Sequence, residues 1–304
     1  MRVAVIGAGP SGLLVGVALA RRGHQAIAVD RDGGPPSQGH WARRGVMQFH
    51  HAHGFRRQVG EILGEEWPEA FAAWLTLGAE PVCLDLPDGE TELAGYRSRR
   101  ETFERALRAT VGRVRGLDVR RGHVDALLAS GKRVCGLVVD GVSLETDLVV
   151  DASGRSGRAA DAWRGPVEAG GPCGMAYVDR QYRLRDAADP GPLSNPLVWQ
   201  GDFDGYQTIV FLHERGYFSV LLVRPTADVA LKDLRHRAAF DAVCCSIPGL
   251  SAWTDPSLAE AVTDVLPGGP RRNACRGQGG PGGTRVVPGL VSVGDSVATT
   301  TPTV

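Results

Sequence analysis

The chain has 304 residues, 43% of them hydrophobic, and a formal net charge of zero. This length supports a large core in one domain or two, and the balanced charge gives no support for binding to nucleic acids or to anionic membranes. No apolar run approaches a membrane span, and the 6 cysteines show neither a CxxC pair nor zinc spacing. Because no signal peptide is evident after Met1, we expect a cytoplasmic protein with reduced thiols.

The first segment has the pattern of a dinucleotide-binding turn. Arg2 to Ile6 is a short apolar run, which predicts a buried parallel strand. Gly7 then permits a tight turn, Gly9 lets backbone approach a pyrophosphate, and Gly12 lets a helix pack closely on the strand. That helix is expected from Pro10 to Arg22, with the free N–H groups of its first turn directed at the phosphates.

The next strand ends in an acid. It is expected from Gln25 to Val29, and Asp30 follows directly. A carboxylate in this place accepts hydrogen bonds from a ribose diol, and it disfavours a 2′-phosphate, so FAD or NAD fits better than NADP. The alternative, a glycine-rich turn that arose by chance, does not account for the helix and the acid.

A loop, two helices and a hairpin are predicted next. The long loop of residues 33–54 is rich in Gly, Pro, Arg and His, which is typical of a functional loop. Residues 55–74 have helical periodicity, and a further helix is expected at residues 99–115. Between them, residues 81–86 and 91–97 flank a Pro-Asp-Gly turn and predict a β-hairpin.

Short strands with tight turns follow. They predict a β-meander that leads back to the parallel sheet, with strands at residues 118–123, 124–128, 134–139 and 143–144. Leu148 to Val150 is then another buried strand.

From about Gly174 the pattern becomes that of a second, sheet-based domain. Antiparallel strands are expected at residues 178–184, 197–202, 208–212 and 218–223. Helices are expected at residues 230–244 and 257–265. Residues 277–283 are glycine-rich, but no strand precedes them and no lysine follows in the required frame, so we interpret them as a connector.

Two later segments of the chain also have the pattern of ligand-binding turns after buried strands. One reads Asp151-Ala-Ser-Gly-Arg-Ser-Gly-Arg158 directly after the strand that ends at Val150. In the other, the apolar strand from Leu290 to Val293 is followed by Gly294 and Asp295. An acid at the carboxyl end of a buried strand points into the ligand crevice of an α/β sheet; the alternative for Asp295 is a plain helix N-cap.

The three segments together resemble the single-component flavoprotein monooxygenases of the p-hydroxybenzoate-hydroxylase-like superfamily, with its squalene-epoxidase-like and geranylgeranyl-reductase-like branch. The resemblance implies an α/β protein: a Rossmann-like, GR2-type FAD-binding domain with a parallel sheet and a β-meander, and a second, antiparallel-sheet substrate domain. It assigns residues 1–75, 97–160 and 285–304 to the first domain and residues 76–96 and 161–284 to the second.

The resemblance also implies the cofactor contacts. Gly7, Gly9, Gly12 and Asp30 match the family residues that bind the ADP half of FAD. The remaining matches are Arg100 for the phosphate or ribityl region, Val124 for adenine through its backbone, Asp295 for the ribityl chain and Pro302 beside the isoalloxazine ring. The other residues predicted to contact the cofactor are Pro10, Ser11, Arg31, Ser153, Gly154 and Gly294.

The chain departs from the family pattern in two places. Ser153 stands where the family often has the Asp of an Ala-Asp-Gly motif that also serves the nicotinamide cofactor, so the reductant is left open between NADH, NADPH and a separate flavin reductase. The chain also ends at Val304, before the family's Gly-x-Gly turn and helix, so we expect a flavin-binding domain whose C-terminal part is missing.

The histidines of the long loop are candidates for the substrate pocket. His51 and His53 alternate, which suggests that they share one face of an extended segment near flavin or substrate; a purely structural or surface role is the alternative. A metal site is not expected, because no acid or cysteine accompanies them.

The expected function is that of an FAD-dependent monooxygenase, which inserts one oxygen atom into a small molecule through a flavin hydroperoxide. No catalytic side chain is assigned. An apolar or aromatic substrate is suggested by aromatic residues in the second sheet, although they equally suit any core: Tyr177, Tyr182, Trp199, Tyr206, Phe211, Tyr217 and Phe218.

Other functions stay open or are disfavoured. A flavin-dependent reductase or dehydrogenase of an unsaturated substrate and a non-catalytic flavin-fold remnant are the alternatives. A disulfide reductase would need a second GxGxxG motif and a redox cysteine pair. A flavin halogenase would need an early lysine and a Trp-x-Trp motif, whereas the first lysine here is Lys132.

Overall fold

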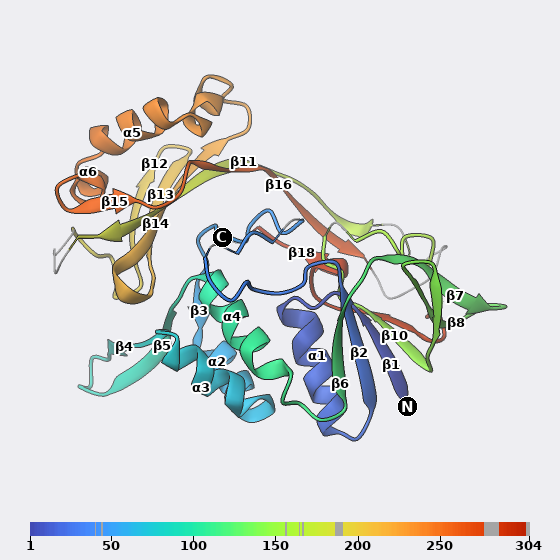
Figure 1. Cartoon of the computed structure of the whole chain (residues 1–304). Coiled ribbons are helices and arrows are strands. Elements are labelled where there is room, and N and C mark those ends of the chain that lie inside the picture. The colour runs from blue at the N-terminus through green and yellow to red at the C-terminus, as the bar shows by residue number, and fades with distance from the viewer. Residues whose placement is uncertain are drawn as a thin grey trace.

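A five-stranded parallel sheet forms the centre of the molecule (Figure 1). The computed structural model describes residues 1–39, 41–43, 45–155, 157–163, 165, 167–185, 191–276 and 286–301. The strand order is β17-β10-β1-β2-β6, and every neighbouring pair is parallel. The strands are β1 (Arg2–Ile6), β2 (Gln25–Asp30), β6 (Leu117–Arg121), β10 (Leu148–Asp151) and β17 (Leu290–Ser292).

Helices cover one face of this sheet. They are α1 (Pro10–Arg21), α2 (Arg57–Glu66), α3 (Pro68–Thr76) and α4 (Arg100–Val111). Their apolar side chains form one core with the sheet residues Val3, Val5, Ala28 and Val150. The single helix expected over residues 55–74 is wrong: the segment begins with β3 (Phe55–Arg56), and the helix is interrupted at Trp67. Pro68 explains the break, because a proline disfavours the helical conformation of the residue before it, and Trp67 is non-helical.

The β-meander covers the other face (Figure 1). It consists of β7 (Val124–Ser130), β8 (Arg133–Val139) and β9 (Val142–Glu145), and its buried Val134 and Leu137 pack on Ala4 and Val149 of the sheet. The strand expected at residues 118–123 is not part of the meander. It is β6, which pairs with β2 because Leu117 and Val119 pack against the helical core.

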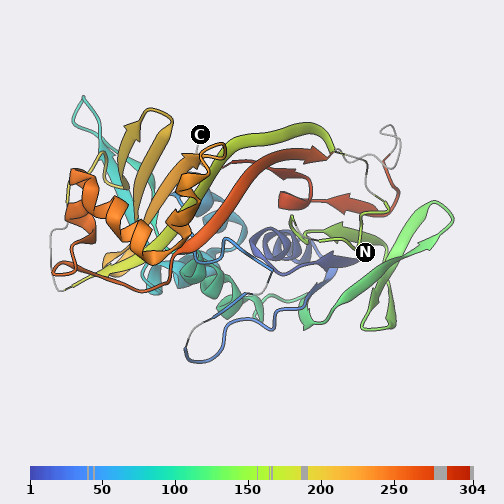
Figure 2. The same ribbon diagram turned by 90° about the horizontal axis from the view of Figure 1, so that it is seen from above.

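A second, antiparallel sheet has the order β12-β13-β14-β11-β16-β18, with β15 paired to β11. Its strands are β11 (Val167–Leu184), β12 (Val198–Phe203), β13 (Tyr206–Leu212), β14 (Tyr217–Pro225), β15 (Ala259–Ala261), β16 (Leu266–Arg276) and β18 (Ala298–Thr299). Figure 2 shows β11 and β16 running side by side over a long distance. The connections include 3-10 turns at Glu214–Gly216, Ala230–Arg235 and Gly294–Ser296.

Two helices, α5 (Arg237–Ser246) and α6 (Pro248–Thr254), pack on the antiparallel sheet. The helix expected at residues 257–265 is wrong, since this stretch contains β15, whose backbone pairs with Tyr182 to Leu184. The helix expected at residues 230–244 is divided, because residues 230–235 form a 3-10 turn. Residues 277–283, interpreted as a connector, lie outside the described residues.

A small three-stranded sheet, β3-β5-β4, completes the fold. It contains the predicted hairpin, β4 (Glu80–Asp85) and β5 (Thr91–Arg97). The predicted fold class, with a parallel sheet, a β-meander and an antiparallel sheet, is confirmed. The division of the chain into two domains stays a prediction. In the described part of the chain, no helix has the length and apolar character needed to cross a membrane.

Candidate functional site

A cavity of about 1040 Å³ opens at the carboxyl ends of the parallel strands. Its lining includes Gly7 after β1, Arg31 after β2, Ser153 after β10 and Val293 after β17. Ligands of open α/β sheets bind at this edge. The volume lies at the upper limit of the roughly 300–1,000 Å³ that is typical of small-molecule and cofactor sites, so the cavity suits a large ligand.

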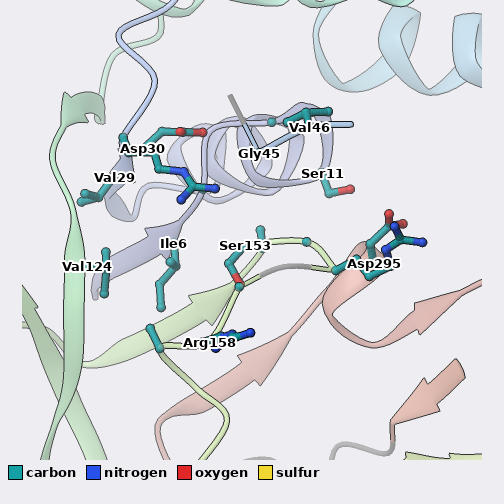
Figure 3. Close-up of a pocket in the computed structure, with 18 of the residues that line it drawn as sticks. Ile6, Ser11, Val29, Asp30, Gly45, Val46, Val124, Ser153, Arg158 and Asp295 are labelled. Atoms are coloured by element: carbon teal, nitrogen blue, oxygen red, sulfur yellow. The ribbon is translucent and has the colours of Figure 1, made fainter. Parts of the chain in front are cut away.

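Most of the predicted cofactor residues line this one cavity: Gly7, Gly9, Pro10, Ser11, Asp30, Arg31, Arg100, Val124, Ser153, Gly154 and Asp295. Asp30 and Val124 lie at one end of it, Ser11 and Asp295 at the other, and Ser153 between them (Figure 3). Gly12, Gly294 and His51 are not among the lining residues, and Pro302 lies outside the described residues.

The glycines hold the turn after β1 tightly against the sheet. Gly7 has a φ of 98°, and a Cβ there would lie 2.6 Å from the carbonyl oxygen of Ala152. A Cβ on Gly12 would lie 2.0 Å from the carbonyl oxygen of Gly7, so only glycine allows α1 to start this close to the strand. Gly9 is less confined, since its nearest neighbour would be the Arg43 side chain at 3.5 Å.

The first turn of α1 is left open to a ligand. Gly9 is the N-cap, no side chain caps the helix, and no acidic residue lies in its first turn. The unpaired N–H groups and the positive end of the helix dipole therefore face the cavity, which is the arrangement that binds phosphate.

Asp30 is already engaged by protein groups. Its Oδ2 accepts a hydrogen bond from the N–H of Ala8 at 2.8 Å, and its Oδ1 accepts one from the N–H of Asp32 at 2.9 Å. The Arg43 Nη2 atom lies 2.8 Å from Oδ2. A ribose diol would therefore share this carboxylate with Arg43, a residue that sequence analysis did not single out.

Arg43 belongs to a buried chain of charges along the cavity. Its Nη1 donates to Glu104, whose other oxygen accepts a 2.6 Å bond from the Nε of Arg100. Burial opposes the charge of Arg43, but Glu104 and Asp30 outweigh it and raise the pKa of Arg43. Arg108 lies one further turn along α4, 3.9 Å from Asp30, and burial lowers its pKa. The i, i+4 spacing of Arg100, Glu104 and Arg108 is the sequence signal that could have indicated these contacts.

His53 ends this chain of contacts, and its tautomer follows from them. Its Nδ1 lies 2.8 Å from the carbonyl oxygen of His51, which only accepts, so Nδ1 carries the proton. Its Nε2 then accepts from the Arg100 Nη1 at 3.3 Å. Burial, followed by the charge of Arg100, lowers the pKa of His53 to about 3. His53 is thus a neutral link between the loop and α4, unsuited to accept a proton.

The segments after β10 and β17 are tied together. Asp151 lies at the end of β10, where its Oδ1 accepts a 3.1 Å bond from the Ser153 N–H and a bond from the Ser153 hydroxyl. The Ser296 hydroxyl donates to the carbonyl oxygen of Asp151 at 2.7 Å. Gly294, with a φ of 62°, makes the turn that brings Asp295 to the cavity, and a Cβ there would lie 2.7 Å from the Ser11 Oγ.

The structure separates the two histidines that were expected to share a face. His53 lines the cavity, whereas the buried His51 lies against β11, with its Nδ1 3.9 Å from the Asp179 Oδ2. Burial, followed by the charge of Arg271, lowers the pKa of His51 to about 4. Among the described residues, no group of three or more His, Cys, Asp or Glu side chains is arranged to hold a metal ion.

No protein-family profile and no curated protein sequence matches the chain. Solved structures do match it. The flavin-dependent brominase Bmp2 is 16% identical, with a TM-score of 0.69 over 98% of this chain and 73% of that chain. A flavoprotein/dehydrogenase from Cytophaga hutchinsonii is 15% identical, with a TM-score of 0.67 over 100% of this chain and 73% of that chain.

A third match, CtdE, was solved in complex with FAD; it is 15% identical, with a TM-score of 0.63 over 98% of this chain and 78% of that chain. The chain has the fold of these flavoproteins. The resemblance predicted from the three sequence segments is thereby confirmed at the level of the fold.

Proposed function

We propose that this chain is an FAD-dependent oxidoreductase. The observation that carries the proposal is the convergence of three distant segments, after β1, β10 and β17, on one cavity at the carboxyl ends of the parallel strands. The match between the cavity and FAD rests on backbone geometry as well as on side chains. A Cβ on Gly7 or Gly12 would collide with backbone, and the two glycines keep the start of α1 accessible to a pyrophosphate.

The residues of the cavity suggest how the cofactor lies. In this proposal the adenosine half lies near Asp30, Arg31 and Val124, and the pyrophosphate meets the N-terminus of α1 at Gly9, Pro10 and Ser11. The flavin half then lies toward Ser153, Gly154 and Asp295. Arg100 is held by Glu104 and His53 at the wall of the cavity, where it would contact the phosphate or ribityl region.

FAD, when bound, supplies the redox chemistry, which is the transfer of electrons from a reductant to oxygen or to a substrate. The chain supplies binding, orientation and exclusion of water. Within the class of oxidoreductases we favour a monooxygenase of an apolar or aromatic small molecule, with substrate bound between the cavity and the antiparallel sheet. NADH, NADPH or a separate flavin reductase is the source of electrons.

A flavin-dependent reductase or dehydrogenase is the second candidate. It is favoured by Ser153, which stands where the monooxygenase pattern has an acid, and by the structural likeness to a flavoprotein/dehydrogenase. The likeness to a brominase raises the question of halogenation. A flavin halogenase would need an early lysine, however, and the first lysine of this chain is Lys132, which lies in the β-meander.

Cofactor binding is tested by the visible absorption spectrum of the purified chain, before and after addition of FAD and desalting. We expect a retained flavin band. A chain that retains no flavin, while its circular dichroism shows it folded, would contradict the proposal.

The reaction class is tested on the flavin-loaded chain. Oxidation of NADH or NADPH is followed together with oxygen consumption and hydrogen peroxide release. A monooxygenase consumes oxygen, and a suitable substrate lowers the fraction of the consumed oxygen that is released as hydrogen peroxide. A reductase or dehydrogenase turns over an electron acceptor without oxygen, and this outcome would replace the first candidate by the second.

A further inference from the structure

A second polar cluster lies outside the cofactor cavity, where the antiparallel sheet meets the loop of residues 45–54. Tyr177 of β11 is at its centre. The guanidinium carbon of Arg271, on β16, lies 4.1 Å from the centroid of the Tyr177 ring. The His51 ring approaches the same ring edge-on, with centroids 5.3 Å apart. The loop is held on the sheet by the N–H of Ala52, which donates to Asp179.

Arg271 is the unusual member of this cluster. Only 9% of the residue is exposed, yet its Nε and Nη2 atoms are buried without a hydrogen-bond partner. No ion pair of Arg271 exists among the residues that the structure describes. A buried guanidinium without a counter-charge destabilises a protein, so its presence calls for an explanation.

The geometry of the guanidinium indicates what it is suited to bind. Nε–H and one N–H of Nη2 lie on the same edge of the planar group, and together they match the two oxygens of one oxyanion. Packing against the Tyr177 ring fixes the plane of this edge. A fixed, unpartnered pair of donors is preorganised for a carboxylate or a phosphate group.

The surrounding charge favours the same ligand. Burial, followed by the positive charge of Arg155, lowers the pKa of Arg271 to about 10. Arg155 itself lines the cofactor cavity, next to Ser153 and Gly154. A positive charge on the cavity wall therefore acts on Arg271, and an anion bound to Arg271 would offset this repulsion.

We propose that Arg271 binds an oxyanion group of the substrate, a carboxylate or a phosphate ester, beside Tyr177. This inference rests on the proposed function and narrows its substrate to small molecules that carry such a group. Substrate held here would lie between the antiparallel sheet and the end of the cavity that Asp295 lines.

The test measures binding to the purified chain by isothermal titration calorimetry, with benzoate, phenyl phosphate and uncharged benzamide as probes. We expect at least one of the two anions to bind more tightly than benzamide, and the tighter one identifies the preferred group. Arg271→Met should weaken its binding about 10- to 100-fold, the loss that corresponds to a charged hydrogen-bonded pair. Arg271→Lys keeps the charge but not the paired donors, so it should show an intermediate loss.

Arg272→Met is the matched control. Arg272 is the next residue on β16, it is exposed, and its side chain points to the opposite face of the strand. The control should bind the anion as the wild type does. If both anions bind no better than benzamide, or if Arg271→Met and Arg271→Lys bind them as the wild type does, the proposal is overturned.

A purely structural role for Arg271 is distinguished by thermal unfolding. With no ligand added, Arg271→Met should unfold at a temperature no lower than the wild type, and only the wild type should be stabilised by the anion. If Arg271→Met does not fold, Arg271→Lys decides the question, since it should still weaken anion binding. The titration needs no flavin, so a chain that binds the anion but retains no FAD would contradict the proposed function while showing that the anion site at Arg271 exists.

Discussion

Glu104 is the residue on which the charges of the cofactor cavity depend. Only 2% of it is exposed, and it accepts hydrogen bonds from both Arg43 and Arg100. Arg43 in turn neutralises part of Asp30, so one carboxylate on α4 sets the charge balance from the Asp30 end of the cavity to His53.

Replacing this carboxylate should be costly. Glu104→Gln removes the counter-charge that the buried Arg43 and the half-buried Arg100 share, and we expect the free energy of unfolding to fall by about 3 kcal/mol or more. Urea unfolding measures the loss. Glu101→Gln is the matched control, because Glu101 lies on the same helix and forms a more exposed pair with Arg105 at 2.8 Å; about 1 kcal/mol or less is expected there. Equal losses in the two variants would show that the network is unimportant.

Asp179 should make stability depend on pH. It is fully buried, and this burial raises its pKa to about 7. Between about pH 4 and pH 7 the folded chain therefore holds a proton that the unfolded chain has released, so this residue's contribution to stability falls as the pH rises and is constant above about pH 7. The neighbouring His51, with its pKa lowered to about 4, acts in the opposite direction between about pH 4 and 6.5.

Comparison with Asp179→Asn isolates this effect, since His51 is present in both proteins. From pH 5 to pH 7, the free energy of unfolding of the wild type should fall relative to the variant by up to about 1.4 kcal/mol per pH unit. Urea unfolding at pH 5, 6, 7 and 8 provides the measurement. A difference between the two proteins that stays constant over this range would refute the prediction.

At the scale of elements, the close approach of α1 to the sheet is the feature that the cavity requires. Gly7→Ala forces a Cβ to 2.6 Å from the Ala152 carbonyl oxygen at a φ of 98°, so we expect a loss of about 2–4 kcal/mol and no retained flavin. Gly23→Ala is the control at the other end of α1: its φ is 84°, but nothing lies within 4 Å of the added Cβ. About 1 kcal/mol and normal flavin retention are expected there, measured by unfolding and by absorption.

The elements that could be predicted from the sequence are those whose signals are local. Strand β1, helix α1 and strand β2 follow from an apolar run, a glycine turn and a C-terminal glycine within one short segment. Strand β16 was missed because Pro267, Gly268, Gly269 and Pro270 interrupt any alternation. Its conformation comes from pairing with β11, a partner far away in the sequence.

The same distinction applies to the candidate site. Its glycines and Asp30 belong to a contiguous pattern, so they could be named in advance. The contact of Arg43 with Glu104 joins a loop to a helix across 61 positions, and no local rule connects them. Arg271 was missed for a related reason, since an unpartnered guanidinium is recognised only once its surroundings are known.

At the scale of the whole molecule, Glu214 joins the antiparallel sheet to the helical layer. It lies in the 3-10 turn between β13 and β14, fully buried, and accepts bonds from the Arg99 N–H at 2.7 Å and the Arg99 Nε at 2.9 Å. The Thr102 hydroxyl, on α4, donates to it as well. This one carboxylate therefore connects the two sheets through the start of α4.

Glu214→Ala should weaken this connection. We expect a loss of about 3–5 kcal/mol, and we expect circular dichroism and tryptophan fluorescence to report transitions that no longer coincide. Glu80→Gln is the control, because Glu80 is more exposed and accepts one 2.8 Å bond from the Arg215 N–H. Coincident transitions in Glu214→Ala would mean that other contacts suffice to unite the two sheets.

The position of β17 has a consequence for how the protein is made. Strands β1, β2, β6 and β10 all lie before residue 152 and are synthesised first. Strand β17, which pairs with the free edge of β10, is synthesised more than a hundred residues later. Until then the nascent sheet presents the unpaired backbone of Leu148–Asp151, and such an edge invites pairing with other chains. The interval between the two strands is therefore the stage at which we expect chaperones to matter most for this chain.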